Sequence, residues 1–140
     1  MAGDCETNFT IIIADRNPNI RKLIMRELSP CGGRICPAKD IGAVIHLLGR
    51  HDGFDILIID PDLPGEMALE KLMCTLSGHP GLTIILHAYL CDYAGKPLFP
   101  PGTIIVEKRR NSIEKLTNAV RSLIHRQTPS AQEIRHAQDT

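Results

Sequence analysis

Two short runs, each ended by an aspartate, constrain the fold of this chain more than any other feature. Residues 9–14 (Phe-Thr-Ile-Ile-Ile-Ala) lead to Asp15, and residues 55–59 (Asp-Ile-Leu-Ile-Ile) lead to Asp60. A strand with one solvent-exposed face alternates apolar and polar side chains, whereas these runs stay apolar over successive positions. Strands of a parallel sheet covered on both faces have this pattern. The runs therefore predict a buried sheet with helices on either side.

Segments with the apolar spacing of helices alternate with the strands. Asn17-Pro18 supplies an N-cap and a proline for the first position of a helix with apolar residues at 20, 23, 24 and 28. Further strands are predicted at residues 34–36, 82–86 and 103–106, and further helices after Asp40, Gly65 and Asn111. Alternating strands and helices imply right-handed crossovers between parallel strands. We predict an α/β domain with a doubly wound, five-stranded parallel sheet.

The composition is that of one soluble domain. The chain of 140 residues is long enough for a single core, which we place at residues 9–126, between an N-terminal extension (1–8) and a polar, disordered tail (127–140). Its 16 basic and 16 acidic residues cancel, which argues against nucleic acid or a membrane as the partner. The odd count of five cysteines predicts reduced thiols. The acidic start, without an apolar signal core, predicts a cytoplasmic protein.

Polar residues at the ends of the predicted strands are the candidate functional residues. Asp15, Asp60, His87 and Lys108 each follow an apolar strand. In doubly wound sheets, ligands bind at the carboxyl ends of the strands. We therefore expect Asp15, Asp60 and Lys108 to meet in one pocket, with their strands side by side at the sheet centre.

Three motifs, in this order, resemble the receiver domain of two-component response regulators, the CheY-like family. They are residues 11–16 (Ile-Ile-Ile-Ala-Asp-Arg), residues 55–65 (Asp-Ile-Leu-Ile-Ile-Asp-Pro-Asp-Leu-Pro-Gly) and residues 105–108 (Ile-Val-Glu-Lys). The resemblance covers residues 9–126 and implies the flavodoxin-like receiver topology. It makes Asp60 the phosphoacceptor and Lys108, His87 and Ala88 the residues that contact the phosphoryl group.

The resemblance also implies a magnesium ion. Asp15, Asp60 and the backbone carbonyl of Asp62 match the positions of its ligands. A carboxylate that attacks a phosphoryl group meets strong negative charge, and a divalent cation and an ammonium group offset that charge. Mg²⁺ prefers oxygen ligands and keeps several waters, so one or two carboxylates are enough.

The pocket departs from the family at two positions. Arg16 modifies the pocket because it replaces the second acid, and two arrangements stay open: it pairs with Asp15 or Asp60 in place of the cation, or it points to solvent beside a weaker magnesium site. Magnesium binding is thus expected to be weak or absent. His87 replaces the hydroxyl residue that follows the phosphoryl group in the family, so the conformational switch is expected to be altered or absent.

The segment 89–102 predicts a missing or shortened fourth helix. It contains three prolines and lacks the apolar spacing of a helix. We expect an irregular loop in which Tyr93 or Phe99 covers the exposed edge of the sheet.

Two functions remain open. The first is a stand-alone receiver that accepts a phosphoryl group from a histidine kinase or phosphotransfer protein, with Mg²⁺, and signals to a downstream protein partner. The alternative is a pseudo-receiver that binds proteins without being phosphorylated. An enzyme is not expected, since neither a nucleotide-type glycine loop nor a nucleophile–base pair is found. A homodimer is compatible with either function.

Overall fold

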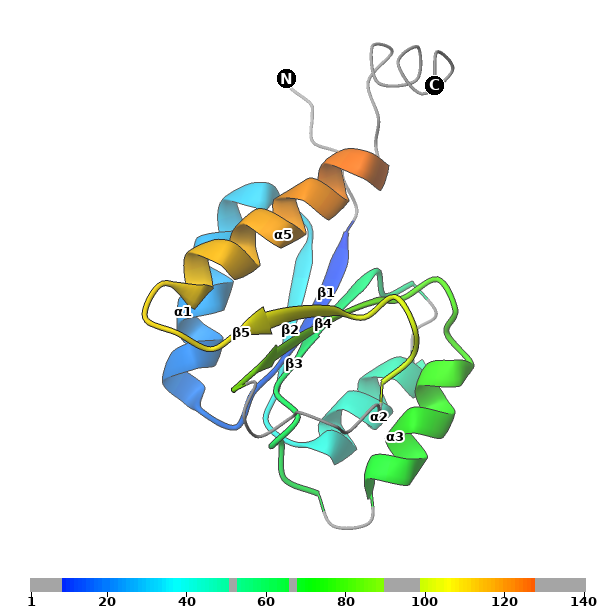
Figure 1. The fold of residues 1–140 in the computed structure, drawn as a ribbon. Coiled ribbons are helices and arrows are strands. Elements are labelled where there is room, and N and C mark those ends of the chain that lie inside the picture. Colours follow the sequence, from blue (N-terminus) through cyan, green and yellow to red (C-terminus); the bar gives the residue numbers. More distant parts are fainter. Residues whose placement is uncertain (1–8, 51–52, 66–67, 90–98, 128–140) are drawn as a thin grey trace.

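A five-stranded parallel sheet forms the centre of the computed structural model, which describes residues 9–50, 53–65, 68–89 and 99–127 (Figure 1). The strands are β1 (Thr10–Ala14), β2 (Arg34–Ala38), β3 (Ile56–Ile59), β4 (Thr83–Ala88) and β5 (Ile104–Glu107), in the order β2-β1-β3-β4-β5. The helices are α1 (Pro18–Leu28), α2 (Ile41–Arg50), α3 (Ala68–Ser77) and α5 (Ser112–Gln127), with a 3-10 turn at Ser29–Cys31. The predicted α/β class and doubly wound sheet are confirmed.

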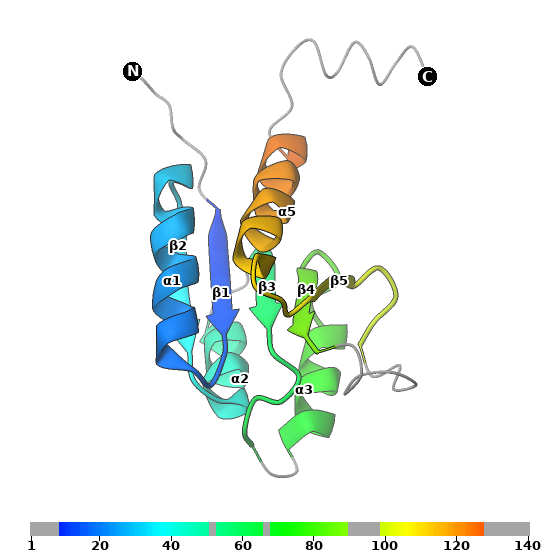
Figure 2. The same ribbon diagram turned by 60° about the vertical axis from the view of Figure 1, so that its left-hand side comes forward.

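Helices cover both faces of the sheet, with α1 and α5 on one and α2 and α3 on the other (Figure 2). Successive side chains of a strand point to opposite faces. On β1, Ile11 and Ile13 belong to the α1/α5 core, whereas Ile12 and Ala14 belong to the α2/α3 core. This explains why the strands are apolar at successive positions.

The helix starts follow the capping residues of the sequence. The Asn17 side chain accepts a hydrogen bond from the backbone N–H of Asn19 at 2.9 Å, with Pro18 in the first turn. Asp40 Oδ1 accepts one from the N–H of Ala43 at 2.8 Å and begins α2. These caps fix where the chain turns from the sheet edge into each helix.

Strand β2 is longer than predicted, because it continues through Pro37 to Ala38. The N–H of Arg34 donates to Phe9 O, and Ala38 O accepts from the N–H of Asp15, so residues 34, 36 and 38 face β1. Pro37 lies between them, and its nitrogen faces the outer edge of the sheet. A proline there removes no hydrogen bond from the sheet. Strand β4 also differs from the prediction, since it spans residues 83–88 and so includes His87 and Ala88.

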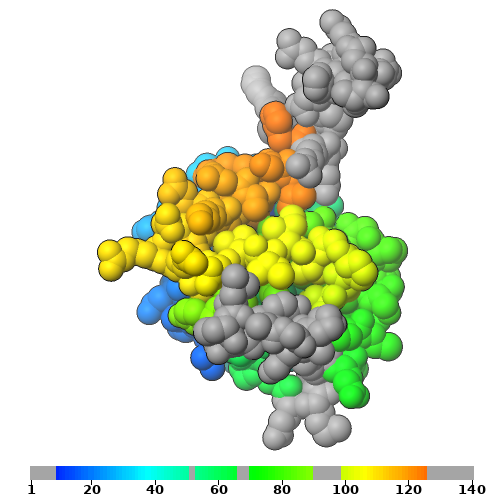
Figure 3. Space-filling model, in the orientation of Figure 1, coloured from blue at the N-terminus to red at the C-terminus, as the bar shows by residue number. Residues whose placement is uncertain are grey.

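Residues 90–98 lie outside the described residues, so the predicted loss of the fourth helix and the role of Tyr93 stay predictions, as do the expectations for residues 1–8 and 128–140. Phe99 is half-buried and packs against the α2/α3 core. In the space-filling view, residues leading into β5 (yellow) form a band between α5 (orange) and α3 (green) (Figure 3). Within the described part of the chain, no helix has the length and apolarity needed to cross a bilayer.

Candidate functional site

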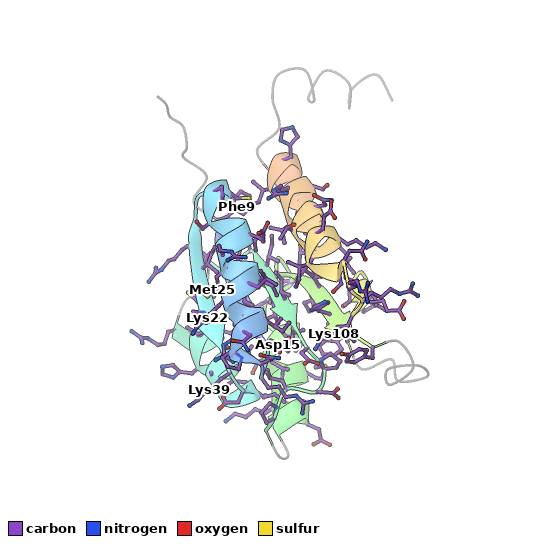
Figure 4. The ribbon with its side chains drawn as sticks, turned by 90° about the vertical axis from the view of Figure 1, so that its left-hand side faces the viewer. Phe9, Asp15, Lys22, Met25, Lys39 and Lys108 are labelled. Carbon is purple, nitrogen blue, oxygen red and sulfur yellow. The ribbon has the colours of Figure 1, made fainter. Side chains whose placement is uncertain are left out.

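The alternation of side chains between the two faces of the sheet brings four polar side chains together where the strands end. Each of them stands two positions after a strand residue whose side chain lies in the α1/α5 core; they are Asp15, Asp60, His87 and Lys108. The strand residues are Ile13, Ile58, Ile85 and Val106. Side chains two apart on a strand share a face, so all four polar residues project to the α1/α5 side at the carboxyl edge. Figure 4 shows Asp15 and Lys108 at the opposite end of the sheet from Phe9.

Asp60 is buried, and each oxygen of its carboxylate accepts a hydrogen bond. One carboxylate oxygen, Oδ2, accepts a hydrogen bond from Lys108 Nζ at 2.8 Å, and Oδ1 accepts one from the backbone N–H of Asp62 at 2.9 Å. Its own N–H donates to Ala14 O, which ties the turn after β3 to β1. The carboxylate therefore has a fixed orientation at the base of the pocket.

Asp15 is the second buried carboxylate of this pocket. Its Oδ1 accepts a hydrogen bond from the N–H of Asn17 at 2.9 Å, and its Oδ2 lies 3.6 Å from Lys108 Nζ. Arg21 donates to its backbone carbonyl at 2.6 Å. One ammonium group therefore neutralises part of the charge of two carboxylates.

Lys108 reaches this position from the edge of the sheet. We expected its strand beside β1 and β3, and this was wrong: β4 lies between β3 and β5. The long, flexible side chain of lysine spans the distance from the end of β5 to Asp60. The backbone N–H of Lys108 donates to Ala88 O at 2.8 Å. Nζ also lies 5.5 Å from the centre of the Tyr89 ring. Burial lowers the pKa of Lys108, but the hydrogen bond and charge of Asp60 and the charge of Asp15 outweigh it and raise the pKa above its usual value.

His87 differs from the other three because it is not paired with a carboxylate. It is 2% exposed, and its Nε2 lies 2.9 Å from the hydroxyl oxygen of Ser112, the first residue of α5. Burial, followed by the positive charge of Lys108, lowers the pKa of His87 despite the opposing charges of Asp15 and Asp60. The imidazole is therefore neutral at neutral pH. Sequence reasoning missed Ser112, whose only signal is its place at the start of the helix after β5.

This burial predicts a pH dependence of stability. The pKa of His87 is lower in the folded chain than the value of about 6.5 in the unfolded chain. Between these two values the unfolded chain binds more protons, so the free energy of unfolding falls as the pH drops below about 6.5. His87→Gln should reduce this slope in urea unfolding experiments. The exposed His46, changed to Gln, is the control and should leave the slope unchanged.

Arg16 is exposed, and within the described residues no ion pair joins it to Asp15 or Asp60. Of the two arrangements left open, the exposed side chain matches the one in which Arg16 points to solvent, and Lys108 forms the ion pairs with the two carboxylates. Arg16 still lines an open pocket of ≈ 530 Å³. Its walls are residues Asp15, Arg16, Asn17, Ile20, Leu23, Asp60, His87, Tyr89, Lys108, Arg109, Arg110, Ser112 and Ile113.

Ala88 and Asp62, the two remaining predicted site residues, contact the other site residues through backbone groups: Ala88 O accepts from the Lys108 N–H, and the Asp62 N–H donates to Asp60. The Ala88 side chain is buried in the α2/α3 core, on the far side of the sheet from the pocket. The Asp62 side chain is exposed, so only the backbone N–H of Asp62 contacts Asp60. Among the described residues, no three His, Cys, Asp or Glu side chains cluster as a metal-ligand set.

The donor set nevertheless fits magnesium. Asp15 and Asp60 supply two buried carboxylates, and their four oxygens are each engaged by a single described group. A carboxylate oxygen accepts about two hydrogen bonds or ligand contacts, so coordinating capacity remains. Mg²⁺ needs only one or two protein carboxylates, with waters completing its shell.

The comparisons with known proteins bear on the fold. No family model matches the chain. A curated relative, the glycerol metabolism activator of Pseudomonas putida, is 25% identical over 80 residues; the match covers 56% of this chain and 36% of the relative, so the chain spans about a third of that protein. The response regulator TrrA of Thermotoga maritima, solved with Mg²⁺ and BeF, superimposes with a TM-score of 0.69 at 25% identity, covering 82% of this chain and 98% of TrrA.

A CheY-like receiver domain protein from Methanospirillum hungatei gives a TM-score of 0.68 at 19% identity, with 86% of this chain and 98% of that chain covered. The sheet order and the carboxylate pocket define a flavodoxin-like α/β domain. Within that class, the fold is that of the response-regulator receiver domains, the CheY-like domains of two-component signalling.

Proposed function

We propose that this chain is a receiver that accepts a phosphoryl group on Asp60 from a histidine kinase or phosphotransfer protein and passes the signal on by protein contact. The observation that carries the proposal is the 2.8 Å contact between Asp60 and Lys108, with Asp15 on the same ammonium group. A carboxylate nucleophile beside a cation that can hold phosphoryl oxygens is the arrangement that this transfer requires.

The transfer follows from these positions. An Asp60 carboxylate oxygen attacks the phosphorus atom as the bond to the donor's leaving group breaks, and an acyl phosphate results. Lys108 then moves its hydrogen bond from the carboxylate to the transferred group. A magnesium ion held by Asp15, Asp60 and the Asp62 carbonyl would offset the charge of the phosphoryl oxygens.

The experiment is mass spectrometry of the whole protein after treatment with acetyl phosphate, with and without magnesium. We expect the added mass of one phosphoryl group, in the presence of magnesium only, and fragmentation should place it on Asp60. A protein that stays unmodified with both reagents would contradict the proposal.

The second candidate is a receiver fold that binds its partner without phosphorylation. Arg16 in place of an acid and His87 in place of a hydroxyl residue favour it. The exposure of Arg16 weakens this support, because Lys108 rather than Arg16 forms the ion pairs with Asp15 and Asp60. A partner that binds the untreated and the phosphorylated protein equally well would support this candidate.

Arg16 is expected to weaken magnesium binding because it supplies a positive charge where a carboxylate would bind the ion. Arg16→Asp should lower the magnesium dissociation constant by about tenfold, equivalent to about 1.4 kcal/mol, because it removes a charge that repels the ion and adds one that attracts it. Isothermal titration measures it. Arg110→Asp is the matched control, since Arg110 is also exposed at the same pocket. An equal gain in both variants would mean that net charge, not ligation at position 16, sets the affinity.

A further inference from the structure

A groove lies beside α1, on a different side of this helix from the pocket that contains Asp60. In α1, Ile20 and Leu23 line that pocket, whereas Lys22 and Met25 line the groove. Residues three or four positions apart lie on the same side of a helix, and positions 18, 22 and 25 follow this spacing. They form one stripe along α1, so the groove is a surface separate from the pocket in which phosphoryl transfer is proposed.

The groove is lined mainly by apolar side chains. These come from α1 on one side and from the end of β2 and the first turn of α2 on the other: Pro18, Met25, Pro37, Ala38 and Ala43. The groove has a volume of ≈ 600 Å³, within the range of about 300 to 1,000 Å³ for sites that take ligand-sized groups. Met25 and Ala43 are half-buried and Pro37 is exposed, so apolar surface is open to a partner.

Positive charge flanks this apolar lining. Lys22 and Lys39 line the groove from α1 and from the turn between β2 and α2, and both are exposed. None of the ion pairs in the described part of the chain includes either lysine. Figure 4 shows Met25, Lys22 and Lys39 one below another on the α1 side of the molecule. The two ammonium groups are therefore available to anionic groups of a partner.

Among the described residues that line the groove, none is acidic. Arg21 adds a third positive charge, and its guanidinium donates a hydrogen bond to Asp15 O at 2.6 Å. Asp40 follows Lys39 in the chain, but its Oδ1 accepts from the Ala43 N–H as the cap of α2. The whole chain has 16 basic and 16 acidic residues, so the groove is a local concentration of positive charge.

We propose that this groove is a docking site for an acidic amphipathic helix of a partner protein. The apolar stripe of that helix packs against Met25 and Ala43, and its carboxylates lie beside Lys22 and Lys39. An amphipathic helix that lays its apolar face into a groove is recognised through its side chains, and charges on either side of the stripe fix its register. A nucleic acid would match the lysines but not the apolar lining. Docking here requires no phosphoryl group on Asp60, so it does not rest on the proposed function.

The test uses a synthetic peptide of about 15 residues, the length at which an isolated helix begins to be stable in water. Leucines three and four positions apart form its apolar stripe, and glutamates occupy the flanking positions. In NMR titrations of the full chain, the amide signals of residues 18–25 and 37–43 should shift, whereas those of residues 112–127 in α5 should not. A peptide that does not bind, or that shifts the signals of α5 instead, would overturn the inference.

Two altered peptides separate the apolar contribution from the charged one. Serines in place of the leucines remove the apolar stripe, and lysines in place of the glutamates turn attraction into repulsion. Each altered peptide should bind at least about tenfold more weakly than the original. Undiminished binding of the serine peptide would mean that charge alone holds the helix, and undiminished binding of the lysine peptide would mean that Lys22 and Lys39 take no part. Either result contradicts the inference.

Lys22→Glu and Lys39→Glu should each weaken binding of the glutamate peptide by about fivefold, the scale of one exposed ion pair turned into a repulsion. Both variants should strengthen binding of the lysine peptide. Lys115→Glu is the matched control, because Lys115 is an exposed lysine of α5 outside the groove and its change in net charge is the same. If Lys115→Glu changes the affinities as much as the two groove variants do, overall charge attracts the peptide and the inference fails.

Analytical ultracentrifugation of the protein alone tests the other occupant of the groove, a second copy of this chain. We expect the unmodified protein and Lys22→Glu to sediment alike. A dimer that forms in the unmodified protein and is lost in Lys22→Glu would assign the groove to a second copy and overturn the proposal.

Discussion

Asp60→Asn is expected to abolish phosphoryl incorporation from acetyl phosphate. An amide has no anionic oxygen to attack phosphorus, and Asp15, the other buried carboxylate of the described pocket, lies farther from Lys108 Nζ, at 3.6 Å against 2.8 Å. The fold should survive the change. Asparagine keeps an oxygen for the Asp62 N–H, and Lys108 keeps Asp15 as a partner. Mass spectrometry and circular dichroism measure the two effects.

Asp55 provides the matched control at the other end of the same strand. Its Oδ2 accepts a hydrogen bond from the Thr10 N–H at 2.9 Å, far from the pocket, and asparagine would preserve an acceptor there. Asp55→Asn should therefore incorporate phosphoryl like the unmodified protein. Retained incorporation in Asp60→Asn, or loss in both variants, would contradict the assignment of Asp60.

Lys108→Ala is expected to lower the free energy of unfolding by about 3 kcal/mol at neutral pH. The change leaves Asp15 and Asp60, each 3% exposed, facing one another without a cation. Removing one partner of a buried ion pair destabilises by about 3 to 5 kcal/mol, and the 16% exposure of the Lys108 side chain places it at the lower end. Urea unfolding measures the difference.

The Lys108→Arg variant identifies the cause of this loss. Arginine keeps a positive charge beside Asp15 and Asp60, so Lys108→Arg should lose much less stability than Lys108→Ala. Equal losses in the two variants would mean that Lys108 stabilises the fold through packing of its aliphatic stem rather than through its charge.

Much of the fold follows from local patterns in the sequence. The β-branched runs ending at Asp15 and Asp60 need cover on both faces, and the caps at Asn17 and Asp40 fix where two helices begin. The alternation of side chains along the strands then places Asp15, Asp60 and Lys108 on one side of the sheet. These features depend on near neighbours in the chain, which is why the sequence alone predicts them.

Other features of the site depend on contacts between distant segments. Whether Arg16 pairs with a carboxylate or is exposed depends on which cation the fold places beside Asp60. That cation is Lys108, which lies 48 residues after Asp60 in the sequence. The His87–Ser112 contact depends on how α5 packs after β5, which no periodicity encodes. The end of β2 was misjudged for another reason: proline usually ends a strand, but at an outer edge its missing N–H removes no bond.

Pro37 has a further consequence, for contacts between molecules. Strand β2 is the last strand on its side of the sheet, and its outward-facing groups are those that a strand from another chain would pair with. Position 37 offers no N–H to such a strand, so a continuous intermolecular ladder cannot form there. The β2 side of the sheet is thereby protected against the edge-to-edge growth through which exposed strands start aggregates.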